Sequence, residues 1–146
     1  MKKVITICAS VSHYRQIIPI EKELRALGYK VLMPDMLRVM KKSDNFNPDT
    51  YKTWFKNKND YSKKTALIRN HFKKIFKSDA ILVLNFQKNE IPGYIGGNVL
   101  MEMTLAFHYK KPIFILNEVS RELSYTEEIY GMKPKFINGD LGKIKL

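Results

Sequence analysis

Short apolar runs alternate with longer amphipathic segments along most of this 146-residue chain. The runs are rich in β-branched residues, which is typical of buried parallel strands. The four strands predicted in this way cover residues 4–9, 29–33, 80–86 and 112–116, and a fifth short strand is expected at 135–138. Apolar residues at helical spacing predict helices over about 14–27, 61–76 and 99–109. Strands that alternate with helices predict one α/β domain whose parallel sheet is covered on both faces.

Two residues affect how the first predicted helix begins and ends. Gly28 follows Leu27, at a place where a helix C-terminus favours a left-handed residue. Pro19 interrupts the helical pattern, because proline is tolerated only in the first turn of a helix. The helix is therefore expected either to bend at Pro19 or to begin near it.

Residues 36–60 are polar and aromatic and carry no clear periodicity. Asn45, Asn47 and Pro48 are turn signals in this segment. Trp54 and Phe55 are expected to pack a local helix onto the body of the domain. A segment of this length between a strand and a helix predicts a basic insertion or lid within a single domain over residues 1–146.

The chain carries a formal net charge of +12, and much of this charge lies between Lys41 and Lys77. Ten lysines and Arg69 in that stretch outnumber its three aspartates. Such a field favours anionic ligands or nucleic acid, and the alternative is a solvated lysine-rich surface. Because lysines dominate and arginines do not cluster, recognition of nucleic-acid bases is less favoured than binding of a small anion.

Cys8 is the only cysteine, which excludes a disulfide within the chain and favours a reducing, cytoplasmic compartment. One cysteine and three scattered histidines disfavour a structural zinc site, so no metal and no cofactor are expected. Cys8 is interpreted as a core residue, and His71 and His108 as exposed residues on helices. No apolar run approaches the roughly 20 residues of a membrane span, so no membrane partner is expected.

A glycine-rich turn at 93–98 is the strongest local signal for a ligand site. Glycines let backbone N–H groups approach a ligand closely, and a helix N-terminus favours anions. Gly96, Gly97 and Asn98 therefore predict a bound anion or polar group, and the alternative is a turn with no ligand.

Glu102 follows Asn98 by one helical turn and lies beside apolar positions of the predicted helix. A glutamate is rarely buried unless it has a partner or a chemical task. Glu102 is therefore the candidate nucleophile or general base. The alternative is a carboxylate that only hydrogen-bonds a neighbouring loop or caps the backbone.

A second polar cluster follows the first predicted strand and contains Ser10, Ser12, His13, Tyr14 and Arg15. These groups are suited to hold a phosphate, and the alternative is that Ser12 only caps the next helix. In open parallel sheets, ligands bind beyond the carboxyl ends of the strands. Asn85 lies at one such end.

Several short segments stand in a characteristic order along the chain. They are Ile-Cys-Ala-Ser at 7–10, the helix end at 24–29, Val-Leu-Met-Pro at 31–34, the strand at 78–85, the glycine-rich turn, Glu-Met-Thr-Leu-Ala at 102–106 and Lys-Lys-Pro-Ile at 110–113. Their order and spacing resemble the nucleoside 2-deoxyribosyltransferase-like superfamily. The resemblance covers most of the chain except about 36–60 and the C-terminal tail.

This resemblance implies a flavodoxin-like three-layer sandwich with a four- to five-stranded parallel sheet. It also implies cleavage or transfer at the N-glycosidic bond of a deoxynucleoside or its 5′-monophosphate. The helix glutamate of that family attacks C1′ and forms a covalent glycosyl-enzyme intermediate, and Glu102 matches its position. The implied substrate-binding residues are Ser10, Ser12, Tyr14, Asn85, Tyr94, Gly96, Gly97 and Asn98.

The sequence departs from the family pattern at two places. Many members carry an aspartate near the end of the third strand to handle the base, where this chain has Asn85. An aspartate is also common in the loop before the helix, where Tyr94 and Asn98 stand here. A module that binds a nucleotide without turnover is therefore one alternative, and a nucleic-acid-binding protein that uses residues 41–77 is another.

The expected partner is a small-molecule nucleotide or nucleoside. Relatives often complete the pocket with a neighbouring subunit, so a homo-oligomer is an option.

Overall fold

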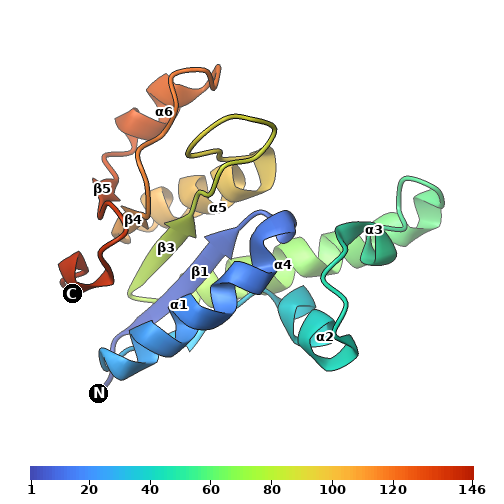
Figure 1. Cartoon of the computed structure of the whole chain (residues 1–146), viewed down its shortest axis with the longest axis horizontal. Helices are drawn as coiled ribbons and strands as arrows, with labels where there is room; N and C mark the ends of the chain where they lie inside the picture. The colour runs from blue at the N-terminus through green and yellow to red at the C-terminus, as the bar shows by residue number, and fades with distance from the viewer.

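A computed structural model of residues 1–146 shows a five-stranded, all-parallel sheet with helices on both faces (Figure 1). The strands are β1 (Val4–Ala9), β2 (Lys30–Leu32), β3 (Ala80–Leu84), β4 (Ile113–Ile115) and β5 (Lys135–Phe136). Their spatial order, β2-β1-β3-β4-β5, is that of flavodoxin-like proteins. The predicted α/β class and flavodoxin-like three-layer sandwich are therefore confirmed.

Six α-helices connect and cover these strands. They are α1 (Tyr14–Ala26), α2 (Asp35–Ser43), α3 (Pro48–Tyr51), α4 (Tyr61–Lys77), α5 (Gly97–His108) and α6 (Thr126–Gly131). Three short 3₁₀ helices, η1 (Val11–His13), η2 (Lys58–Asp60) and η3 (Leu141–Lys143), complete the chain. None of the helices combines the length and the apolar sequence that a membrane crossing requires.

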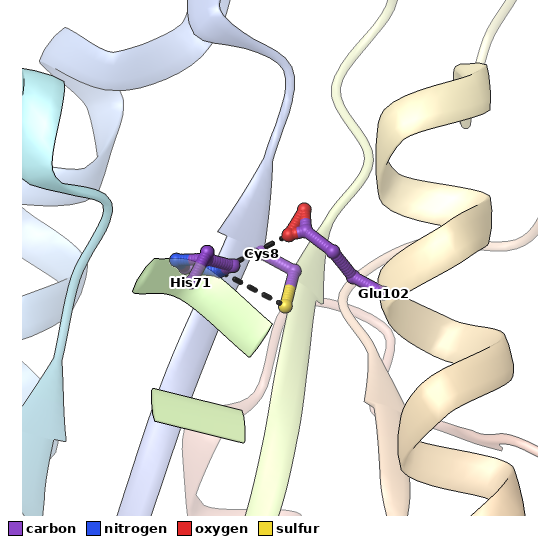
Figure 2. A group of neighbouring side chains, drawn as sticks. All are labelled: Cys8, His71 and Glu102. Atoms are coloured by element: carbon purple, nitrogen blue, oxygen red, sulfur yellow. Dashed lines mark hydrogen bonds and ion pairs between the residues drawn. The ribbon is translucent and has the colours of Figure 1, made fainter. Parts of the chain in front are cut away.

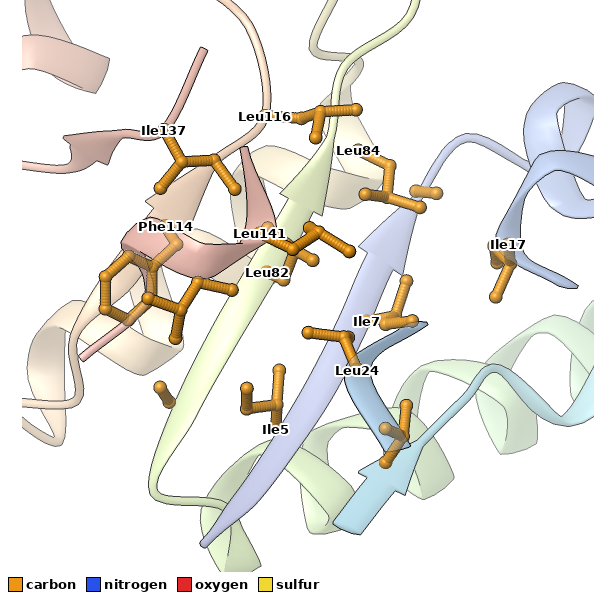
Figure 3. Packing of buried hydrophobic residues seen from close by; sticks show 14 of the residues in the cluster. Ile5, Ile7, Ile17, Leu24, Leu82, Leu84, Phe114, Leu116, Ile137 and Leu141 are labelled. Carbon is orange, nitrogen blue, oxygen red and sulfur yellow. The ribbon is translucent and has the colours of Figure 1, made fainter. Parts of the chain in front are cut away.

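The alternation of side chains along β1 decides which residues face which helical layer. Ile5 and Ile7 point to one side, where they join a core that includes Ile17 and Leu24 of α1 (Figure 3). Cys8 points to the other side and belongs to the core beneath α4 and α5. Because side chains on a strand alternate with a period of two, Cys8 is directed toward the layer that carries the candidate glutamate.

The connections leave a switch point between β1 and β3. The chain leaves β1 through α1 to reach β2 on one side, whereas it leaves β3 through α5 to reach β4 on the other. The crevice between diverging connections is where open α/β sheets bind their ligands. The fold therefore indicates a ligand site at the carboxyl ends of β1 and β3.

The loop between β3 and α5 is fixed to the sheet by specific contacts. The Asn85 side chain donates to the carbonyl oxygens of Gly93 and Asn117, at 3.3 and 2.7 Å, and accepts from the backbone N–H of Asn117 at 2.9 Å. Gly93 has a φ of +63°, and a Cβ there would lie 1.9 Å from the carbonyl oxygen of Glu118. Only glycine fits such a position, so the loop enters α5 along one defined path.

The expected elements differ from the structure mainly at their ends and in the segment 36–60. Helix α1 begins at Tyr14 and carries Pro19 inside it, so the alternative of a helix that begins near Pro19 is wrong. Gly28 is left-handed, as predicted, with a φ of +97°. Trp54 is buried as expected, but Phe55 is 76% exposed and packs no helix onto the body. Both residues lie in a turn after α3.

Candidate functional site

A cavity of about 210 Å³ opens at the carboxyl ends of β1 and β3. Seven of the residues predicted to form the site line it: Ser10, Tyr14, Tyr94, Gly96, Gly97, Asn98 and Glu102. They come from the end of β1, the start of α1 and the junction of the glycine-rich loop with α5. Two stretches that are about 80 residues apart in the sequence therefore meet in one wall.

Four residues of the predicted site and polar clusters lie outside the cavity wall. His13 is buried in η1, where its Nε2 lies 3.2 Å from the carbonyl oxygen of Gln87. Asn85 is fully buried, and its side chain is engaged with the backbone of Gly93 and Asn117. Ser12 is exposed in η1, and its side chain caps neither η1 nor α1. The guanidinium of Arg15 lies over the ring of Phe46, 4.5 Å from its centroid.

Glu102 is only 3% exposed although it lines the cavity. It shares the inner face of α5 with Val99, Met103 and Ala106, all of which are buried in the core. The side-chain amide of Asn98 donates to Oε1 of Glu102 at 3.3 Å. Oε2 has no hydrogen-bond partner of good geometry, which is uncommon for a buried carboxyl oxygen.

His71 is buried beside Glu102, so the prediction that it is exposed is wrong. Nε2 of His71 lies 3.1 Å from Oε2 of Glu102 and 3.6 Å from Sγ of Cys8 (Figure 2). His71 lies three residues after Ile68 and four before Ile75, so it shares their face of α4. This spacing was the sequence signal for its burial. His108 is exposed near the end of α5, as predicted.

Burial decides the charge of the Glu102–His71 pair. Desolvation raises the pKa of Glu102 to about 8, against a smaller opposing effect of the Lys64 charge. Desolvation also lowers the pKa of His71 to about 4, and the charge of Lys74 adds to that shift. At neutral pH the carboxyl therefore keeps its proton while the imidazole is neutral, and that proton lies within reach of Nε2.

Tyr14 also packs close to this pair, with 9% of its surface exposed. Desolvation and the nearby Glu102 carboxylate raise the pKa of its hydroxyl. Tyr14 is therefore a neutral hydroxyl that faces the cavity from the first turn of α1.

Three lysines from separate segments line the same cavity, and sequence reasoning did not single them out. Lys52 follows α3, Lys64 lies on α4, and Lys88 lies in the turn after β3. Burial and the positive charge of Lys52 lower the pKa of both Lys64 and Lys88. The ammonium group of Lys52 therefore repels those of Lys64 and Lys88, and an anion bound near Lys52 would relieve that repulsion.

Aromatic rings accompany two of these lysines. Nζ of Lys64 lies 5.6 Å from the ring centroid of Trp54, and Nζ of Lys88 lies 5.5 Å from that of Tyr94. Nζ of Lys88 also donates to Oγ of Ser10 at 2.9 Å. The cavity thus combines cationic groups with flat aromatic surfaces near one buried carboxyl.

Neither the family models nor the curated proteins searched contain a match to this chain. The chemistry of the site therefore has to follow from the geometry of its own residues.

Replacing Glu102 with glutamine tests the raised pKa through stability. Between the ordinary carboxyl value of 4.5 and the folded value of about 8, the folded chain holds a proton that the unfolded chain releases. Wild-type stability therefore falls as pH rises through this window, and Glu102→Gln removes that loss. We expect the free energy of unfolding of Glu102→Gln, relative to wild type, to increase by a few kcal/mol between about pH 5 and about pH 8.

Urea unfolding at a series of pH values provides this measurement. Glu23→Gln is the matched control, because Glu23 is exposed on α1 and its loss should give no comparable trend. A difference between Glu102→Gln and wild type that does not vary with pH would show that Glu102 titrates normally.

Proposed function

We propose that this protein cleaves or transfers the N-glycosidic bond of a nucleotide or deoxynucleotide, with Glu102 as the nucleophile that forms a covalent glycosyl-enzyme intermediate. The observation that carries the proposal is the Glu102 carboxyl, 3% exposed in the wall of a cavity that also presents Lys52, Lys64 and Lys88. A buried carboxyl beside a cluster of cations suits a substrate that is anionic at one end and reactive at the other.

The cavity walls match the parts of a nucleotide. Lysine ammonium groups bind phosphate oxygens through charge-assisted hydrogen bonds. Tyr94, which is half-buried in the cavity wall, offers a flat face on which a base can stack. The exposed N-terminus of α5, at Gly97 and Asn98, is a further favourable place for an anion.

The protonated state of Glu102 allows the first step to balance. An oxygen of Glu102 forms a bond to C1′ as the bond from C1′ to the base nitrogen breaks, and that electron pair leaves with the base. The carboxyl proton is released in the same step, and Nε2 of His71, 3.1 Å from Oε2, is placed to take it. The departing base takes up one proton from solvent, and His71, whose pKa is about 4, returns its proton to solvent, so the step balances.

The second step restores the enzyme. Water, or an acceptor base in a transfer reaction, attacks C1′ of the glycosyl ester and breaks its bond to the Glu102 oxygen. The proton lost by the attacking group returns to the carboxyl. His71 serves both steps as a neutral base whose low pKa favours giving the proton up again.

The source of the proton matters because Asn85 stands where many members of the resembled family carry an aspartate. An asparagine cannot protonate a leaving base, and here its side chain is occupied by backbone hydrogen bonds. The proton that the base takes up therefore comes from solvent, to which the Glu102–His71 pair releases one proton in the same step. The resemblance of the chain to the nucleoside 2-deoxyribosyltransferase-like superfamily supports the same reaction class.

Incubation with ribo- and deoxynucleoside 5′-monophosphates tests the proposal. We expect at least one of them to release free base, detected by chromatography, and we expect Glu102→Gln to reduce the rate by at least about a thousandfold. Glu23→Gln, on the outside of α1, should behave like wild type.

Two results would contradict this reaction. A folded wild-type protein that releases no base from any of these nucleotides, yet is stabilised by them in thermal unfolding, would be a binding module. Base release that persists in Glu102→Gln would assign the chemistry to another residue.

Replacing Lys88 tests whether the lysines bind the phosphate. The loss of one charge-assisted contact should raise the KM for a nucleoside 5′-monophosphate by about 10- to 100-fold. The KM for the corresponding nucleoside should change little, because it has no phosphate. Lys73→Ala is the control, since Lys73 is exposed on α4 and does not line the cavity. Equal effects of Lys88→Ala on nucleotide and nucleoside would contradict the assignment.

A further inference from the structure

We propose that Cys8, His71 and Glu102 form a binding site for one tetrahedral divalent cation of the zinc type, and that an ion bound there prevents Glu102 from reacting. The existence of the ion site rests only on the geometry of these three residues. Its inhibitory effect rests on the proposed glycosidic function.

Two of the distances between the three ligand atoms are close to those between zinc ligands. Zinc holds sulfur at about 2.3 Å and nitrogen or oxygen at about 2.0–2.2 Å, which places tetrahedral ligand atoms roughly 3.3–3.6 Å apart. The distance from Sγ of Cys8 to Nε2 of His71 is 3.6 Å, and from Nε2 to Oε2 of Glu102 it is 3.1 Å. All three atoms lie within 4.8 Å of one another.

The ligands project from three regular elements, not from loops. Cys8 lies on β1, His71 on α4 and Glu102 on α5, and their side chains point toward a common centre (Figure 2). Both helices pack on the face of the sheet to which Cys8 points. The site is therefore held in position by the core before any ion binds.

The carboxyl of Glu102 has an unused ligand atom at this centre. Oε2 is buried and lacks a hydrogen-bond partner of good geometry, although Oε1 accepts from Asn98. A metal ion would satisfy this oxygen. It would also leave the Asn98 contact in place.

The cavity provides both access and the fourth position. His71 and Glu102 line the cavity, whereas Cys8 lies beneath them and is fully buried. An ion held by the three residues would therefore face the cavity on its remaining side. Three protein ligands with one position open to water or an anion are typical of accessible zinc sites.

The chemistry of the ligands selects the ion. A thiolate and an imidazole favour zinc and similar borderline ions, whereas magnesium and calcium prefer oxygen ligands alone. Binding requires the thiolate of Cys8 and the carboxylate of Glu102, so two protons leave as one dication enters.

An ion on Glu102 and a glycosyl group on Glu102 exclude each other. The metal takes the oxygen electron pair that would attack C1′. It also takes the Nε2 lone pair of His71 that would accept the proton. Zinc should therefore inhibit base release, and an excess of chelator should restore it.

Cobalt titration of the full-length protein tests the site without substrate. We expect one equivalent of Co²⁺ to produce a thiolate-to-cobalt charge-transfer absorbance that Zn²⁺ then removes. Cys8→Ser and His71→Ala should each lose this absorbance, and Cys8→Ala provides a second variant if serine disturbs folding. His108→Ala is the control, because His108 is an exposed histidine outside the cavity.

The possible results separate the ion site from the proposed reaction. No charge-transfer absorbance in the folded wild-type protein, or one that persists unchanged in His71→Ala, would overturn the site. Cobalt binding in a protein that releases no base would support the site and count only against the proposed function. Where base is released, zinc inhibition should weaken at least about tenfold in Cys8→Ser, and unchanged inhibition would overturn the inhibitory role.

Discussion

The contact between the Glu102 carboxyl and the His71 imidazole is the interaction on which the site depends. Both groups are buried, and burial without a full ion-pairing partner favours the neutral form of each. The result is an acid and a base that face each other 3.1 Å apart at neutral pH without carrying charge. Such a pair can release a proton when one member reacts and recover it afterwards, which is what a covalent mechanism with a departing base requires.

The fold brings this pair to the cavity through simple periodicities. The period of two in β1 turns Cys8 toward α4 and α5, while Ile5 and Ile7 face α1. Helical spacing on α4 places His71 on the face of Ile75, and α5 buries Glu102 beside Met103. The switch point between β1 and β3 opens the crevice above them.

The strands, the long helices and Glu102 could be predicted from the sequence, because each depends on local periodicity or on a turn. Gly96, Gly97 and Asn98 were predicted near Glu102 because they precede it in the same helix start. His71 was missed because its neighbours on α4 are lysines and asparagine, which suggested an exposed position, although its spacing from Ile68 and Ile75 indicated otherwise. Lys52, Trp54 and Lys88 could not be found in this way, since only the tertiary fold brings their segments to one cavity. The expectation that no metal binds rests on one cysteine and three scattered histidines, and it stays a prediction. The scatter of these residues along the chain does not register that β1, α4 and α5 bring Cys8, His71 and Glu102 together.

Infrared difference spectroscopy on wild type and Glu102→Gln tests most directly whether Glu102 holds its proton. The difference isolates the vibrations of this carboxyl. At neutral pH we predict a protonated C=O stretch that is converted to carboxylate bands as pH rises through about 8. Carboxylate bands alone at neutral pH, with no protonated carboxyl until well below pH 5, would contradict the neutral Glu102–His71 pair and the proton route that depends on it.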